Sequence, residues 1–125
     1  MNTTGPTVEQ VLESMQARME SVPDAVDKAA WVDPAMVREQ AHGSAFAMPA
    51  DDGALSPETR ILVYLAAALA TSNHACTKAM ANKAKVQGIA DEKLLEAFHI
   101  ARFALATRVV GNAEPLFDML TARRR

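Results

Sequence analysis

The sequence lacks the features of several large classes of protein. Of its 125 residues only one is cysteine, and only 5% are aromatic. A single cysteine excludes a disulfide within the chain and is typical of proteins from the reducing cytoplasm. The formal net charge of −2 gives no electrostatic reason to expect a nucleic-acid partner.

Long apolar segments are also missing. The longest apolar run, Ile61 to Ala70, is far shorter than the roughly 18 to 20 residues that a transmembrane helix needs. The start of the chain, MNTTGPTVEQ, contains neither a basic region nor an apolar run, so it lacks the pattern of a signal peptide. We therefore expect a soluble, cytoplasmic protein with no membrane partner.

Patterns for bound metals and cofactors are absent as well. His42, His74, Cys76 and His99 are not spaced as local metal ligands. The sequence has no glycine-rich loop of the kind that holds phosphates or dinucleotides. We expect neither a metal nor a cofactor.

What the sequence does contain is hydrophobic residues, 50% of the total, with helical spacing. Over residues 7–20 they recur at three- and four-residue steps, which predicts an amphipathic helix. Thr7 and Gln10 have the spacing of a capping box at its start. No segment shows the two-residue alternation of a strand. We predict an all-α fold, a single domain over residues 1–125 with six or seven helices.

Capping residues, prolines and glycines predict where the other helices begin and end. Residues 48–55, MPADDGAL, are expected to form a loop, and His42, beside Gly43, to lie at a helix end. Asp24 is expected to cap a short helix, and Asp33, followed by Pro34, to cap one that runs through Gln40. Ser56 with Pro57 should start the next helix, and Asn73 should cap one that ends at Gly88. Asp91 should cap a helix that ends before Gly111, and Pro115 should lie in the first turn of a final helix.

The helix that contains Ile61 to Ala70 is apolar on all sides, so it has to be covered on most of them. It is therefore expected to be central, or to be covered by a neighbouring subunit. The next two helices are joined by a short turn around Gly88, and short connections favour antiparallel packing. We expect those two helices to pack against each other.

Several stretches together resemble a known family. Leu55-Ser56-Pro57 leads into an apolar helix that begins near Arg60, and a small polar turn then enters the helix of Cys76. The later stretch GIADEKLLEA, residues 88–97, also fits. From Gly53 to about Phe117 the sequence resembles the carboxymuconolactone decarboxylase and alkylhydroperoxidase D family. The resemblance implies an alkylhydroperoxidase D-like helical bundle, a homo-oligomer (trimer or hexamer), and active sites near subunit contacts.

Peroxidase members of that family carry the motif Cys-x-x-Cys-x-x-x-His and a glutamate on the preceding helix. In this alignment Cys76 matches the second cysteine, whereas Asn73 and Met80 replace the first cysteine and the histidine. Ala75 and Ile61 replace the other histidine and the glutamate. Asparagine cannot resolve a sulfenic acid into a disulfide, and neither isoleucine nor methionine can transfer protons. We therefore predict that the family's dithiol cycle is absent. The missing histidine also weakens a decarboxylase-type reaction.

Cys76 and His99 are the candidate catalytic residues. Cys76 would lie in the first turn of its helix, where backbone N–H groups favour the thiolate form, or it is simply a small buried hydrophobe. His99 lies between Leu95 and Phe103 at four-residue spacing, which is typical of a core histidine. It is also the best candidate for a displaced general base, and we expect it to line the same cavity as Cys76.

Asn73, His74 and Met80 surround Cys76 in the sequence and are the candidate substrate-binding residues. His74 would be an exposed residue of the turn if it has no such role. Three functions remain open. The first is a peroxidase- or reductase-like reaction of Cys76 with an external thiol. The second is a non-thiol transformation of a small organic acid or lactone. The third is a non-catalytic oligomer that binds a small ligand or a partner.

Overall fold

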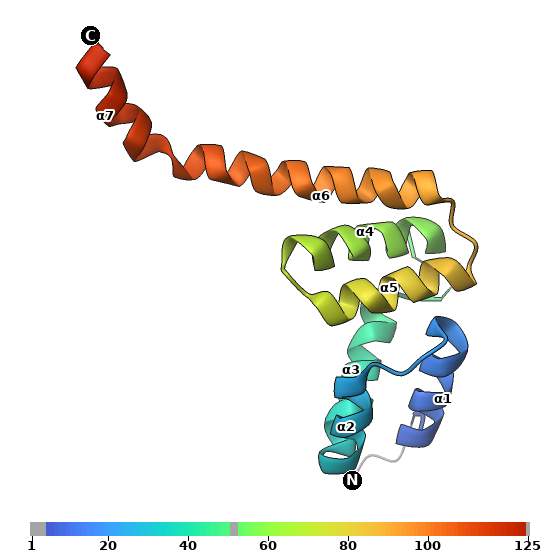
Figure 1. Ribbon diagram of the computed structural model, residues 1–125. Coiled ribbons are helices and arrows are strands. Elements are labelled where there is room, and N and C mark those ends of the chain that lie inside the picture. Colours follow the sequence, from blue (N-terminus) through green and yellow to red (C-terminus); the bar gives the residue numbers. More distant parts are fainter. Residues whose placement is uncertain (1–4, 51–52, 125) are drawn as a thin grey trace.

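The computed structural model describes residues 5–50 and 53–124, which form seven α-helices and no strand (Figure 1). This confirms the predicted all-α fold. The helices are α1 (Val8–Met19), α2 (Asp24–Val32), α3 (Pro34–Ala47), α4 (Pro57–Ala70), α5 (His74–Val86), α6 (Asp91–Asn112) and α7 (Glu114–Arg124).

Local hydrogen bonds explain where four of the helices begin. The Thr7 hydroxyl accepts from the Gln10 N–H, and the Gln10 side chain accepts in return from the Thr7 N–H, which completes the capping box of α1. Side chains of Asp33, Ser56 and Asn73 cap α3, α4 and α5 in the same way. Gly88, with φ of 67°, supplies the left-handed residue after α5.

Four sequence predictions about helix ends are wrong. Pro23 and Ala90 hold the N-cap positions of α2 and α6, so Asp24 and Asp91 are the first helical residues rather than caps. His42 and Gly43 lie inside α3, which runs past Gln40 to Ala47. Likewise α6 continues through Gly111 to Asn112. An interior glycine costs a helix only about 1 kcal/mol relative to alanine, which its other residues can offset.

The core forms around α4, as the apolar run predicted. Ile61 and Leu65 of α4 are buried with Met80 and Ala84 of α5, and with Ala97 of α6. Helix α4 lies between α5 and α6 (Figure 1) and packs extensively against both. The prediction that α5 and α6 pack against each other is therefore wrong, because α4 has apolar faces for both and separates them.

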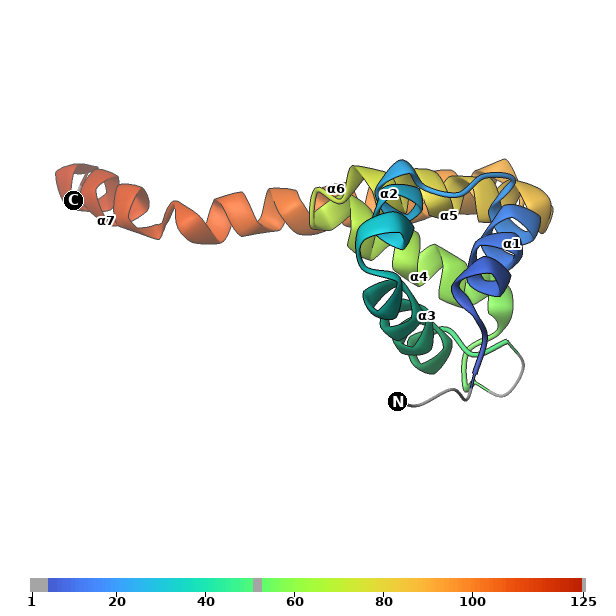
Figure 2. The same ribbon diagram turned by 90° about the horizontal axis from the view of Figure 1, so that it is seen from below.

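The C-terminal half of α6 and the whole of α7 extend away from the other helices, as both views show (Figures 1 and 2). Large apolar side chains on this segment are exposed, with Phe103 at 72% and Val109 at 67%. The others are Leu105, Val110, Leu116, Phe117 and Met119. We call residues 102–124 the C-terminal arm. Among the described residues, no helix is long and apolar enough to cross a membrane.

Candidate active site

Cys76 lies beside the only tyrosine of the chain. The Tyr64 hydroxyl and the Cys76 sulfur are 3.2 Å apart, within hydrogen-bonding distance for sulfur. Tyr64 belongs to α4 and Cys76 to the first turn of α5, so the pair bridges the two helices at the end where the chain turns. Cys76 is half-buried and is a free thiol.

The turn between α4 and α5 fixes the position of Cys76. The Asn73 side chain accepts from the Cys76 N–H at 3.1 Å, and the Asn73 N–H donates to the Ala68 carbonyl at 2.9 Å. Ser72 adopts φ of 58°, a left-handed conformation that is uncommon for serine. These contacts connect the start of α5 directly to the end of α4, and so hold the sulfur close to the phenol.

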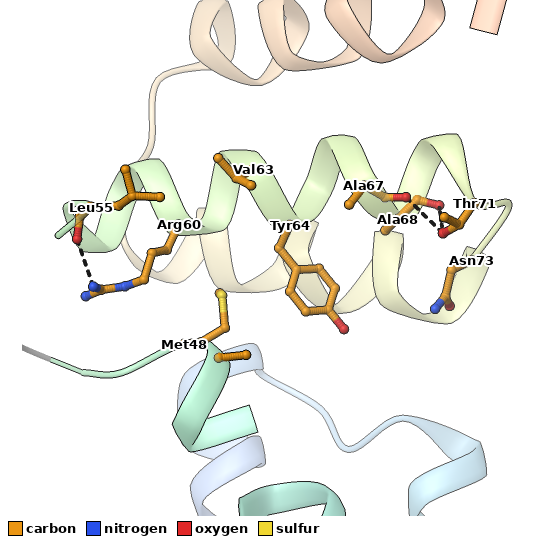
Figure 3. Close-up of a pocket in the computed structure, with 10 residues that line it drawn as sticks. Met48, Leu55, Arg60, Val63, Tyr64, Ala67, Ala68, Thr71 and Asn73 are labelled. Atoms are coloured by element: carbon orange, nitrogen blue, oxygen red, sulfur yellow. Dashed lines mark hydrogen bonds between the residues drawn. The ribbon is translucent and has the colours of Figure 1, made fainter. Parts of the chain in front are cut away.

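A cavity of about 380 Å³ lies next to this pair, between the end of α3 and one face of α4 (Figure 3). Its volume is in the range of small-molecule binding sites. Tyr64 and Asn73 line it, whereas Cys76 does not. Most of the other lining residues are apolar: Ala47, Met48, Leu55, Val63, Ala67 and Ala68. The Tyr64 phenol therefore connects the sulfur to an apolar cavity.

Arg60 is the charged residue of this cavity and is only 6% exposed. Its guanidinium donates to the carbonyls of Leu55 at 2.8 Å and Ala50 at 3.3 Å (Figure 3 shows the first). Within the described part of the chain it makes no ion pair. A Cβ at Gly53 would overlap this guanidinium, so glycine at that position leaves the space that Arg60 occupies.

The five site residues predicted from the sequence do not form one cluster. Asn73 lines the cavity and contacts Cys76, as expected for a site residue. His74 is exposed at the start of α5 and lines no cavity. Met80 is only 7% exposed and belongs to the core cluster, so in a single chain it is a packing residue.

His99 is not a core residue, contrary to the sequence prediction. It is exposed on α6, and its ring packs against that of the neighbouring Phe98, with centroids 5.7 Å apart. Helix α4 separates α6 from Cys76, and His99 lines neither cavity. Within one chain His99 therefore cannot act on the Cys76 sulfur. A catalytic role for it stays a prediction that would require contact with another chain.

Sequence reasoning missed Tyr64 and Arg60. A tyrosine in an otherwise apolar helix needs a partner for its hydroxyl when it is half-buried. That argument could have singled out Tyr64, but it could not have named Cys76 as the partner. Arg60 directly precedes the apolar run, and nothing in the sequence distinguishes it from a surface arginine.

The cysteine changes the acidity of the tyrosine. The hydrogen bond to Cys76, then burial, then the charge of Cys76 raise the pKa of Tyr64 from 10.0 to about 12. A phenol with that pKa keeps its proton at neutral pH. When the sulfur is ionised, Tyr64 is consequently the donor in this hydrogen bond.

This effect predicts a measurable shift, since Tyr64 is the only tyrosine. In Cys76→Ala the largest cause of the raised pKa is lost, and the pKa of Tyr64 should fall from about 12 toward 10.0. Ultraviolet absorbance of the phenolate, followed against pH with circular dichroism in parallel, measures it. Equal midpoints in the two proteins, both still folded, would contradict the contact.

Comparison with known protein families adds one finding. The model of the carboxymuconolactone decarboxylase family matches residues 37–118, about two thirds of the chain. The chain belongs to this family. The match reaches back beyond the resemblance noted from Gly53, and it includes the end of α3, where Ala47 and Met48 line the cavity. No curated protein matches the sequence.

Membership of the carboxymuconolactone decarboxylase family explains the bundle but not the chemistry. Ile61 and Met80, the positions where the resemblance implies proton-transfer residues in peroxidase members, lie in one hydrophobic cluster. In this member those two positions stabilise the core. The polar groups beside Cys76 are instead Tyr64 and Asn73.

Proposed function

We propose that this member of the carboxymuconolactone decarboxylase family is a one-cysteine thiol peroxidase that uses an external thiol as reductant. The observation that supports it best is the 3.2 Å contact between the Tyr64 hydroxyl and the Cys76 sulfur at the edge of an apolar cavity. The phenol hydroxyl can donate a hydrogen bond to the sulfur, and a reactive cysteine needs a polar neighbour of this kind.

The proposed reaction begins with attack of the Cys76 thiolate on one oxygen of a hydroperoxide. A sulfur–oxygen bond forms, the oxygen–oxygen bond breaks, and the leaving alkoxide takes up a proton as an alcohol. The sulfur becomes a sulfenic acid. One external thiol then displaces water to give a mixed disulfide, and a second releases the external disulfide and restores Cys76. The external thiols are needed because the chain has no second cysteine.

Tyr64 and the cavity have separate roles in this proposal. Tyr64 donates to the thiolate before the reaction and to the sulfenate oxygen after it, since its pKa of about 12 keeps it protonated. The apolar cavity favours an organic hydroperoxide over hydrogen peroxide.

The test is consumption of cumene hydroperoxide and hydrogen peroxide by the purified protein with dithiothreitol. A protein that consumes neither faster than dithiothreitol alone would contradict the proposal.

A second candidate function is binding of a small apolar ligand, or a non-thiol reaction of an organic acid, in the same cavity. It is favoured by one observation: Cys76 is not among the residues that line the cavity, whereas Arg60 is. Cys76→Ser should then leave ligand retention and any turnover unchanged. The thiol peroxidase requires the opposite result.

We also propose that the protein is a homo-oligomer. The C-terminal arm carries apolar side chains that are largely exposed in the single chain, such as Phe103. The cavity face of α4 is apolar and open, with Val63 55% exposed. An arm from a second copy matches that face in character, because both are apolar. A trimer or hexamer, as the family resemblance implies, would cover both surfaces.

Light scattering at micromolar concentration should therefore give a mass of at least three chains. Phe103→Glu should shift the protein to a smaller species, because a buried interface cannot solvate the carboxylate. Gln40→Glu, at an exposed position of α3 outside the arm, changes the net charge by the same amount and is the control. A parent protein that is monomeric, or a Phe103→Glu protein of unchanged mass, would contradict the assembly through the arm.

A further inference from the structure

A second, smaller cavity lies on the other side of Arg60 and is lined by basic side chains. Arg18 of α1, Arg60 of α4 and Lys83 of α5 all border it, and its volume is about 170 Å³. The other lining residues that the structure describes carry no charge: Met48, Pro49, Ala50, Pro57, Ile61 and Gln87. Helix α1 is far from α4 and α5 in the sequence, and their packing brings three cations to one small space.

These cations have no carboxylate partner within residues 5–50 and 53–124. Arg18 donates to the Ser14 carbonyl, and Arg60 donates to the carbonyls of Leu55 and Ala50. Lys83 has no hydrogen bond in the described part of the chain. Two more exposed lysines, in contrast, each have a carboxylate partner.

Lys85 is paired with Glu20 at 3.0 Å, and Lys93 is paired with Glu58. The basic cavity therefore keeps a positive charge that the described residues do not neutralise. Burying a cation without an opposite charge is costly. Arg60 is only 6% exposed, so of the three cations it has the most to gain from a bound anion.

The pKa of Lys83 also reflects the positive charge of this cavity. Burial, then the charge of Arg18, then the charge of Arg60 lower the pKa of Lys83. An anion in the cavity would oppose the last two effects, because the side chains of all three cations line the cavity. A bound anion is thus favoured by each of them.

We propose that this cavity binds a small oxyanion of the phosphate class, held by Arg18, Arg60 and Lys83. A volume of about 170 Å³ leaves room for a small tetrahedral anion such as a phosphate group. Guanidinium groups match phosphate oxygens with paired N–H donors, and the lysine adds a point charge. This site is separate from the Tyr64–Cys76 pair and does not depend on the proposed peroxidase reaction.

The test is calorimetric titration of the full-length protein with inorganic phosphate at low salt. The parent should bind one phosphate per chain, whereas acetate and chloride at the same ionic strength should bind at least about tenfold more weakly. Lys83→Gln and Arg18→Gln should each weaken phosphate binding about tenfold or more, as expected for loss of a charged hydrogen bond. Both positions are accessible enough for the variants to fold.

Lys85→Gln is the matched control, because Lys85 lies on the same helix, is 71% exposed, and pairs with Glu20. It should bind phosphate as the parent does. Gly53→Ala keeps every charge but crowds the Arg60 guanidinium, so it should also weaken binding. Glycerol phosphate in place of the free ion distinguishes an organic phosphate from inorganic phosphate as the ligand.

A parent protein that binds no phosphate would overturn the proposal. So would equal losses in Lys83→Gln and Lys85→Gln, since these would reflect net charge alone. If the parent binds no phosphate, substitution of Asp51 and Asp52, which lie outside the described residues, would test whether a carboxylate of the chain itself neutralises the cations.

Discussion

Thiol-dependent consumption of an organic hydroperoxide is expected to fall at least about 100-fold when Cys76 is replaced by serine. The serine hydroxyl is not ionised at neutral pH and does not attack peroxide without a strong base, whereas a thiolate does. Serine keeps the size of the side chain, and its N–H can still donate to Asn73, so the turn should be preserved. The rate of hydroperoxide loss with dithiothreitol measures the effect.

Thr77→Ser is the control for this substitution. Thr77 follows Cys76 in the same turn of α5, and its hydroxyl donates to the Asn73 carbonyl, a bond that serine can also make. It should consume hydroperoxide at the parent's rate. Turnover as fast in Cys76→Ser as in the parent would reject the thiol peroxidase and favour the ligand-binding or non-thiol function of the same cavity.

Replacement of Leu65 by alanine is expected to lower the free energy of unfolding by about 2–5 kcal/mol. Leu65 is 7% exposed and belongs to the cluster in which α4 contacts α5 and α6. Truncation there removes buried methyl groups and leaves a void between helices that cannot close without moving. Denaturant unfolding followed by circular dichroism at one fixed protein concentration measures the loss.

Leu65→Met provides the volume-conserving control and should cost about 1.5 kcal/mol or less. Because Leu65 directly follows Tyr64, the alanine variant should also disturb the contact between Tyr64 and Cys76. A loss of stability no larger for alanine than for methionine would show that α4 is not the centre of the fold.

Family membership alone does not give the activity, as Ile61 and Met80 illustrate: they hold the positions where the resemblance implies proton-transfer residues in peroxidase members. Both side chains are buried in one apolar cluster, where a glutamate or histidine would need a hydrogen-bonding partner. The polar groups that remain near the sulfur come from neighbouring positions. Tyr64 lies about one helical turn after Ile61 on α4, and its hydroxyl contacts the Cys76 sulfur.

The sequence by itself determined the helices and most of their starting points. Thr7, Asp33, Ser56 and Asn73 each bond to a backbone N–H three residues later, so the residues that decide these starts are adjacent in the chain. The apolar run after Arg60 likewise identified the central helix, because a helix without a polar face has to be covered. Family membership followed from the same local patterns.

Only the tertiary structure decided which helix faces meet. Helix α4 separates α5 from α6, so Cys76 contacts Tyr64, and His99 is left exposed on α6. The basic cavity depends on the same long-range packing, since Arg18 and Lys83 come from helices that are distant in the sequence. Such contacts depend on how side chains of several helices fit together, and residue spacing within one helix carries no information about that fit.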